Sequence, residues 1–315
     1  MSTSTGPHQA LAVTTERQRF ATQLFDTLWG QYRQRVEYVT TYEQVVAAAG
    51  AQFHNDHIAF RTFASQQPLA GIATIARIFE ALDYRAAGAY YFEDKALSAL
   101  HFQHPLPQFP KIFISELQTW KLSEPTRHAI ANATRKHRPA VESETLARLY
   151  QLEQESAEGR AALLHEVAAH FTDLPWPLVE RSVVEAVNAE SQYAAWVLVH
   201  GYNVNHFTSL INSHNVAALD DIEKTAAALA KAGVPMKKEI EGERGSKLRQ
   251  TATEAVTMDV EVLENGQPIT MPWTYAYFEL AQRDPVLDPA TGKYERFEGF
   301  LGPQATNLFE MTRVK

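Results

Sequence analysis

The segment FHNDHIAFRTF, residues 53–63, carries the aromatic and branched side chains that β-strands favour, with polar residues between them. Side chains of a strand point alternately to its two faces, so His57 and Arg61 are expected on one face and Asp56 on the other. Burying an imidazole and a guanidinium is unfavourable unless both find polar partners. The segment therefore indicates a functional site on a central strand.

Two later segments offer partners for that site. They are VNHFTSLI, residues 204–211, which contains His206, and YAYFELAQR, residues 275–283, which contains Glu279. Together with His57 they supply two imidazoles and one carboxylate, a candidate set of metal ligands. Such a set on one face of an octahedral ion leaves three positions open, which suits non-haem Fe(II) that binds both a 2-oxo acid and O₂.

Composition excludes several other kinds of protein. The chain has 315 residues, 45% of them hydrophobic, which is enough for a large core. Its formal net charge is −8 and it has no cluster of five basic residues, so no nucleic-acid partner is expected. No apolar run indicates a signal peptide or a membrane span, so we expect a cytoplasmic protein without a membrane partner. Without cysteine, any metal must bind through His, Asp or Glu.

Beyond these segments the chain reads as two copies of one βαβββ module, separated by residues whose patterns are helical. The predicted fold class is therefore α+β, with paired modules and an inserted helical segment. In the first module we expect a helix at 69–82 and strands near 86–92, 99–102 and 111–117. In the second we expect a helix at 219–232, ended by Gly233, and then one continuous strand in each of KKEIEG (237–242), KLRQTATEAVTMDVEVL (247–263) and WTYAYFELAQR (273–283).

These patterns divide the chain into four parts. The N-terminal part combines an arm at 1–14, expected to be frayed, with an amphipathic helix at 16–35. The predicted parts are 1–39 (arm and helix), 40–123 (first module), 124–196 (helical insertion) and 197–315 (second module and a C-terminal lid helix).

The two modules, each with a histidine on its opening strand and the second with a glutamate on its last strand, resemble the vicinal-oxygen-chelate superfamily of glyoxalase-like folds. Within it, the ending GFLGPQATNLFEMTR, residues 299–313, resembles that of 4-hydroxyphenylpyruvate dioxygenase. NDHIAFRTF, VNHFT, GSKLRQTAT and YFELAQR together are similar to the DUF1338 family, over roughly residues 20–312. Members of that family act as 2-oxoadipate dioxygenase/decarboxylases.

The resemblance implies an enzyme of lysine breakdown that converts 2-oxoadipate and O₂ to 2-hydroxyglutarate and CO₂. It implies Fe(II) as the cofactor, held by the three ligand candidates, although Zn, Ni or Mn could replace it in a purified sample. Arg61 lies four residues past His57, roughly 13 Å at about 3.3 Å per residue, and can bind the far carboxylate of the substrate. Arg249 and Gln250 are further candidates for the same pocket. Residues 299–312 are expected to form a lid, with Phe300 or Phe309 excluding water and Gly299 and Gly302 permitting the turn into its helix.

Two other kinds of function stay open at this point. A glyoxalase-like isomerase or lyase would use Glu116 as a fourth ligand to Zn or Ni and would not need O₂. A metal-free binding protein of the same architecture would have no use for the complete ligand set.

The remaining histidines are expected to be structural. His165 and His170 are five residues apart, which places their rings about 140° apart on a helix, so they cannot form the zinc-protease motif. His101 and His104 should face opposite sides of a strand. His200 and His214 flank the segment at 204–211 and could lie near the site without binding the metal.

Overall fold

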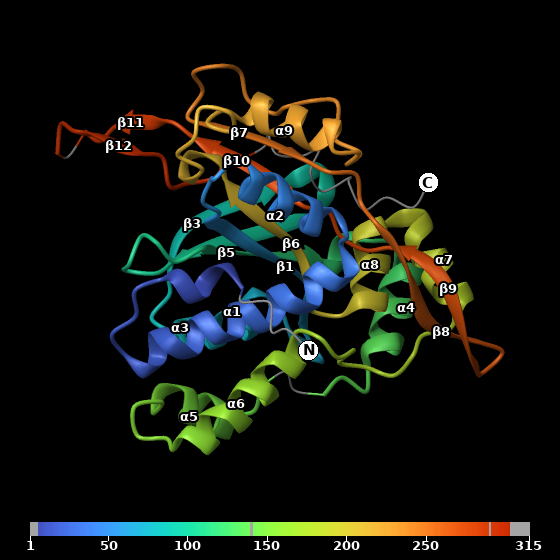
Figure 1. The fold of residues 1–315 in the computed structure, drawn as a ribbon. Coiled ribbons are helices and arrows are strands. Elements are labelled where there is room, and N and C mark those ends of the chain that lie inside the picture. Colours follow the sequence, from blue (N-terminus) through green and yellow to red (C-terminus); the bar gives the residue numbers. More distant parts are fainter. Residues whose placement is uncertain (1–5, 139–140, 290, 303–315) are drawn as a thin grey trace.

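Strand β1, Asn55–Gln66, lies in the middle of the central sheet (Figure 1). The computed structural model describes residues 6–138, 141–289 and 291–302. β1 pairs in parallel with β5, Lys111–Gln118, and antiparallel with β6, Val204–Leu210. Ten of the twelve residues of β1 and all seven of β6 are buried. Most of the segment at 53–63, which indicated a functional site, therefore lies on a central strand whose residues are mostly buried.

The first module has the predicted order of elements. After β1 and the short edge strand β2, Leu69–Ala70, come α3, Ile72–Ala81, then β3, Arg85–Phe92, and β4, Leu97–Gln103, before β5. The strands pair in the order β3-β4-β5-β1, and all contacts except β1 with β5 are antiparallel in this half.

The second module repeats this arrangement on the other side of β1. β6 pairs in parallel with β10, Glu279–Arg283, and β10 pairs antiparallel with β7, Leu248–Ala252. Helix α9, Ile222–Lys231, takes the place that α3 has in the first module. The counterpart of β3 is reduced to two isolated bridges, Met236 to Thr253 and Glu241 to Gln250. The two opening strands, β1 and β6, thus meet at the centre of one curled sheet.

The expectation of long continuous strands at 247–263 and 273–283 is wrong. The chain leaves the central sheet after β7 and forms a separate hairpin of β8, Thr257–Glu264, and β9, Gln267–Thr274, before it returns as β10. The hairpin packs against helices of the insertion. An alternating pattern indicates a strand but does not say which sheet the strand joins. The pattern therefore gave no sign that the chain leaves the central sheet after β7 and returns to it as β10.

Helices cover one face of the central sheet. Helix α1, Glu16–Arg35, begins where predicted, with Thr15 accepting a hydrogen bond from the Gln18 N–H at its start. The ring of Trp29 lies 5.0 Å from that of Phe207 on β6, and the ring of Phe60 on β1 lies 5.5 Å from that of Phe79 on α3. Because neighbouring residues alternate, His57 and His206 face the other side, away from these helices.

The N-terminal arm is not frayed throughout, as had been expected. Residues Pro7–Ala10 form a 3₁₀ turn, η1, in which the imidazole of His8 is buried. Its Nδ1 lies 2.7 Å from Asp26 Oδ1 on α1, and its Nε2 lies 3.2 Å from Asn55 Oδ1 at the start of β1. A single buried histidine without a periodic pattern around it gives no sign of such docking in the sequence.

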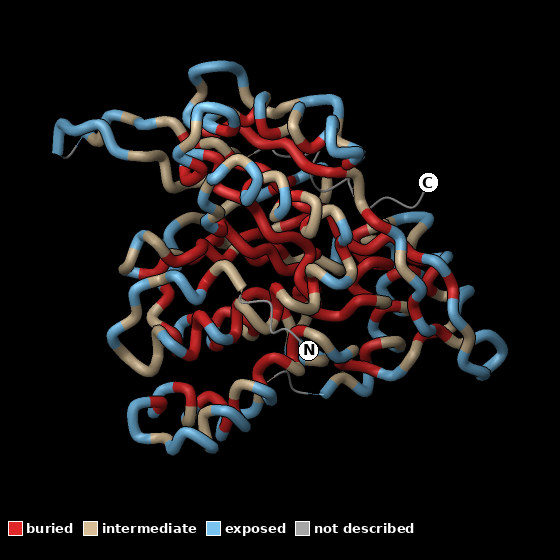
Figure 2. The backbone as a smooth tube through the Cα atoms, viewed as in Figure 1, coloured by how far each residue is buried: buried red, intermediate tan, exposed pale blue. Residues whose placement is uncertain are grey.

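The remaining elements lie around the sheet, and Figure 2 shows buried segments concentrated in its strands. Helix α1 packs against α6 of the insertion on its outer side. None of the helices in the described residues is long and apolar enough to cross a membrane. The other elements are α2, Tyr38–Ala48; η2, Glu93–Lys95; η3, Thr119–Lys121; α4, Glu124–Thr134; α5, Ser143–Tyr150; α6, Ala157–His170; α7, Arg181–Glu190; α8, Gln192–His200; η4, Ile211–Ser213; and a projecting hairpin of β11, Pro285–Leu287, and β12, Tyr294–Arg296.

Candidate metal centre

Three side chains from adjacent strands meet at the centre of the sheet: His57 from β1, His206 from β6 and Glu279 from β10. The two imidazole Nε2 atoms lie 3.3 Å apart. Glu279 Oε2 lies 3.3 Å from His206 Nε2, and its Oε1 lies 3.6 Å from His57 Nε2. Within the described ranges no other group of three such residues is close enough to hold one ion. The structure thus brings together the three residues that the sequence singled out.

Each histidine is held by the residue that precedes it. Asp56 Oδ2 lies 2.8 Å from His57 Nδ1, and Asn205 Oδ1 lies 3.0 Å from His206 Nδ1. The pairing of β1 with β6 is irregular at these two residues, so each strand carries a bulge next to its histidine. Strict alternation had placed Asp56 away from His57, and the bulge overrides it. Because both Nδ1 atoms donate to these oxygens, both Nε2 atoms present lone pairs to the centre.

Asp56 stays ionised because the positive charge of a buried arginine stabilises its carboxylate. Arg283 Nε and Nη2 donate to the two carboxylate oxygens over 2.7 and 2.8 Å. Burial by itself would raise the pKa of Asp56, but the charges of Arg283 and Lys111 hold that pKa well below its usual range. Burial also lowers the pKa of His57, despite the neighbouring Asp56, so His57 is a neutral imidazole with an anionic acceptor behind it.

The centre has the properties of a site for a divalent cation. Burial raises the pKa of Glu279 well above its usual value, and burial, then the nearby His57, lowers the pKa of His206. Gln250 Nε2 donates to Glu279 Oε1 over 2.5 Å, whereas Oε2 is buried and has no hydrogen-bond partner among the described residues. The two imidazole Nε2 atoms and the carboxylate of Glu279 converge on one point, and the Thr208 hydroxyl lies 3.0 Å from His57 Nε2. A metal ion would satisfy all three, so the residues fit the implied cofactor.

The centre opens into a cavity lined by both polar and aromatic side chains. A concave pocket of this character is typical of a site for a small molecule. The walls include Phe92, Phe113, Tyr277 and Phe300, and the further polar groups are Ser115, Asn205 and Gln250.

Arg61 lies in this cavity and is almost completely buried. Its guanidinium carbon lies 5.0 Å from the centre of the Tyr193 ring and 5.2 Å from that of Trp196, both on α8. Such stacking favours a cation that must remain charged in a buried place. Helix α8 belongs to the insertion, so the insertion supplies the rings against which Arg61 lies.

The two neighbouring candidates Arg249 and Gln250 point in opposite directions. Gln250 faces the cavity, where it donates to Glu279. Arg249 is directed to helix α9, where its guanidinium pairs with Glu223 at 2.5 Å and with Asp221 at 3.6 Å. Successive residues on a strand cannot share a face, so the prediction that Arg249 contributes to the pocket is wrong.

Glu116 cannot be a fourth ligand. Its Oε2 accepts a hydrogen bond of 2.8 Å from the N–H of Ile72 at the start of α3, on the face opposite the cavity. The residue of β5 that corresponds to Glu279 is Phe113. Phe113 pairs with Ala59, two residues past His57, just as Glu279 pairs with Thr208, two residues past His206. The first module therefore presents an aromatic ring where the second presents a carboxylate.

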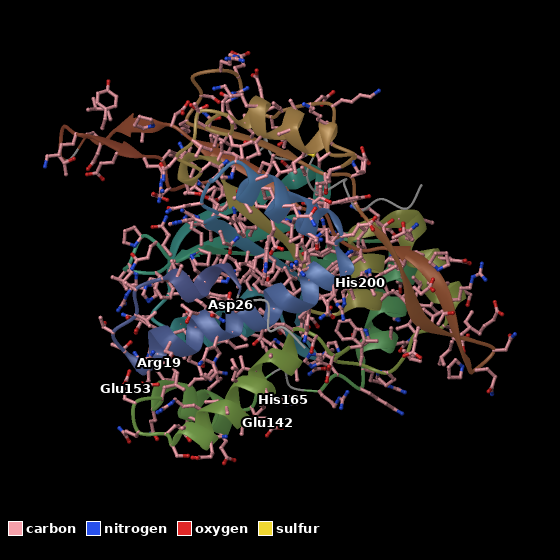
Figure 3. The ribbon with its side chains drawn as sticks, in the orientation of Figure 1. Arg19, Asp26, Glu142, Glu153, His165 and His200 are labelled. Carbon is pink, nitrogen blue, oxygen red and sulfur yellow. The ribbon has the colours of Figure 1, made fainter. Side chains whose placement is uncertain are left out.

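Of the other histidines weighed in the sequence, four have hydrogen-bond partners outside the three ligand candidates. His165 is exposed and His170 is buried on α6, and His200 lies on a different helix (Figure 3). The partners of the rest are Tyr90 for His101, the Leu106 N–H for His104, the Thr274 carbonyl for His200, and Tyr42 and the Leu219 carbonyl for His214.

The beginning of the predicted lid lies over the centre. The ring of Phe300 is 4.9 Å from that of His57, nearly perpendicular to it. The Phe300 N–H donates to the Tyr90 hydroxyl over 3.0 Å, and Arg283 Nη1 donates to the Gly299 carbonyl over 2.6 Å. Neither Gly299 nor Gly302 has a positive φ, and the turn into the predicted helix lies outside the described residues. Phe309 and the lid helix lie outside the described residues.

Comparison with known proteins identifies the family. The sequence model of the 2-oxoadipate dioxygenase/decarboxylase family matches residues 20–310. This chain belongs to that family. Two plant members with that name are each 27% identical to it. The chloroplastic protein of Arabidopsis thaliana matches over 289 residues, 86% of this chain and 71% of its own length, and the chloroplastic/amyloplastic protein of Oryza sativa matches over 293 residues, 87% and 73%.

Solved structures show the same fold. Hydroxyglutarate synthase from Oryza sativa, in complex with 2-oxoadipate, aligns with a TM-score of 0.75 at 23% identity, over 96% of this chain and 97% of that one. A glyoxalase superfamily protein from Ralstonia eutropha aligns with a TM-score of 0.80 at 22% identity, over 91% and 88%. The family resemblance and the predicted fold class are therefore confirmed.

Proposed function

We propose that this chain is an Fe(II)-dependent enzyme that converts 2-oxoadipate and O₂ to 2-hydroxyglutarate and CO₂. The substrate loses its C1 carboxylate as CO₂ and takes up both oxygen atoms, one in the new carboxylate and one in the new hydroxyl group. No separate 2-oxoglutarate is needed, because the substrate carries its own 2-oxo acid. Family membership supports the reaction and its place in lysine breakdown.

The arrangement of the cavity supports the proposal most strongly. The cavity is lined by His57, His206 and Glu279, a set of ligands suited to a metal with open positions, and also by the cationic Arg61. A dicarboxylic 2-oxo acid has complementary ends, with a chelating 2-oxo acid group and a distant carboxylate. A planar guanidinium binds a carboxylate through two parallel hydrogen bonds.

When bound, Fe(II) would supply open coordination positions and would activate O₂, while the four electrons of its net reduction come from the substrate, two from decarboxylation and two from hydroxylation of a C–H bond. The protein residues contribute position and shielding. Asp56 and Asn205 fix the two imidazoles with Nε2 directed inward, and Gln250 fixes the carboxylate of Glu279. The donor set also accepts Zn, Ni or Mn, so a purified sample could hold one of these ions.

Aromatic side chains around the centre exclude water from the reacting groups. Phe113 and Phe300 lie with ring centres 4.9 Å apart, and the ring of Tyr277 stacks on His206 at 4.9 Å. A dry site protects a reactive oxidant from side reactions and strengthens the contact between Arg61 and an anionic substrate.

Oxygen uptake tests the proposed function. Protein purified without O₂ and loaded with Fe(II) is mixed with 2-oxoadipate, 2-oxoglutarate or 2-oxohexanoate in an oxygen electrode, and CO₂ is measured in parallel. We expect 2-oxoadipate to give one CO₂ for each O₂ consumed. With ¹⁸O₂, label should enter both the carboxylate and the hydroxyl group of 2-hydroxyglutarate. Turnover of a 2-oxo acid without O₂ uptake would reject the dioxygenase assignment.

A further inference from the structure

Asn205 is only half satisfied by the protein. It lies in the bulge of β6, is buried, and contributes to the lining of the cavity. Its Oδ1 accepts from His206 Nδ1, but its Nδ2 is buried and has no hydrogen-bond partner among the described residues. A buried amide N–H without an acceptor is unfavourable, and such groups are rare in native structures. The cavity is the place where an acceptor could be supplied.

The corresponding residue of the first module shows that support of the histidine does not require an amide. There the acceptor is the carboxylate of Asp56, whose two oxygens are both used by Arg283 and His57. An asparagine gives the histidine the same kind of oxygen but adds a donor group that a carboxylate lacks. At this position the second module thus carries an amide donor where the first carries a carboxylate.

We propose that Asn205 binds the substrate, with Nδ2 donating a hydrogen bond to an oxygen of the 2-oxo acid group at the metal end. This inference rests on the proposed function. Asn205 adjoins the ligand candidate His206 and contacts its ring, whereas Arg61 lies four residues past His57 along β1. The 2-oxo acid group carries only acceptor oxygens, so it matches an unsatisfied donor. Asn205 therefore recognises the part of the substrate that every 2-oxo acid shares.

Binding to the Zn²⁺-loaded protein tests this role without turnover. Calorimetry gives Kd values for Zn²⁺, for 2-oxoadipate, and for 2-oxohexanoate, which lacks the far carboxylate. Asn205→Asp keeps an acceptor for His206 Nδ1 but replaces the donor by a negative charge. We expect its Kd for both acids to rise by about tenfold or more, the effect of losing one hydrogen bond to a charged group. Its Kd for Zn²⁺ should stay within about threefold of the wild-type value.

Two further variants separate the possible causes. Asn132→Asp makes the same chemical change at an exposed position of α4 and should leave every Kd unchanged. Arg61→Lys should weaken 2-oxoadipate binding but not 2-oxohexanoate binding, whereas Asn205→Asp should weaken the binding of both acids.

Three outcomes decide the matter. If Asn205→Asp binds both acids as tightly as wild type, or loses only the dicarboxylic one, the proposed contact is absent. If its loss of acid binding follows a similar loss of Zn²⁺, Asn205 only supports His206, and the inference is again overturned. If the wild-type protein itself binds no 2-oxo acid, the proposed function fails instead.

Discussion

The buried pair of Asp56 and Arg283 should contribute several kcal/mol to folding stability, because removal of either side chain leaves the charge of the other buried without a partner. Both side chains are fully buried, and Arg283 also donates to the carbonyls of Phe297 and Gly299. Removing one partner of such a pair leaves a buried charge alone, at a cost of about 3–5 kcal/mol. We expect this loss for Asp56→Asn and for Arg283→Met. The double variant should be about as stable as either single one, which corresponds to an interaction energy of about 3–5 kcal/mol in magnitude.

Urea unfolding of the metal-free protein, followed by tryptophan fluorescence, measures the four stabilities without a contribution from bound metal. If the two single losses simply add within about 0.5 kcal/mol, the sites do not interact and the reasoning is refuted. Zn²⁺ binding separates stability from ligand support. Asp56→Asn keeps an acceptor for His57, whereas Asp56→Ala does not, and the latter should lose about 10–100-fold in metal affinity. Equal metal affinity in both variants would remove Asp56 from the support of His57.

Alanine at any one of the three ligand candidates should reduce bound metal to a small fraction of the wild-type level, as measured by mass spectrometry. Glu116→Gln should leave the metal content unchanged. Full metal content in all three alanine variants would reject the site. Arg61→Lys should keep the metal but lower kcat/KM for 2-oxoadipate by about 10–100-fold, the equivalent of one hydrogen bond between charged groups, and unchanged kcat/KM would exclude Arg61 from substrate binding. Burial, then the nearby His137, lowers the pKa of His170 to about 3. The unfolded chain therefore binds a proton there below about pH 6.5 while the folded chain does not, and stability falls as the pH is lowered, by about 1.4 kcal/mol from this group near pH 5.5. Urea midpoints near pH 7.5 and 5.5 should differ less in His170→Leu than in wild type, and an equal difference would contradict that pKa.

The sequence was sufficient for the parts of the site that depend on strand alternation alone. His57, His206 and Glu279 sit on central strands, and their faces follow from counting residues. Alternation also required Arg249 and Gln250 to face opposite ways, so one of these two could have been excluded in advance. Phe113 could not have been recognised as the counterpart of Glu279, because that depends on strand register, which involves partners far apart in the chain.

The bulges and the docked segments could not be predicted from the sequence, for a similar reason. The contacts of Asp56 and Asn205 with their histidines exist because β1 and β6 pair irregularly, and this irregularity belongs to two strands rather than to one. The repeated dipeptides, Asp-His and Asn-His, were nevertheless a visible signal of equivalent positions. The separate hairpin had a signal too. Asn265-Gly266, with φ of 53° and 76°, is the pair favoured at a two-residue hairpin turn.

Phe113 also bears on how a duplicated unit can acquire a new activity. Two identical halves would place four protein donors around a six-coordinate ion and leave only two vacancies, which one bidentate acid would fill. One apolar residue in one half would keep a third vacancy, the room that a diatomic gas requires. A metal centre with two vacancies could hold only one small molecule. A difference between the two modules at the single position of Phe113 and Glu279 is thus enough for a centre that could hold two different molecules together.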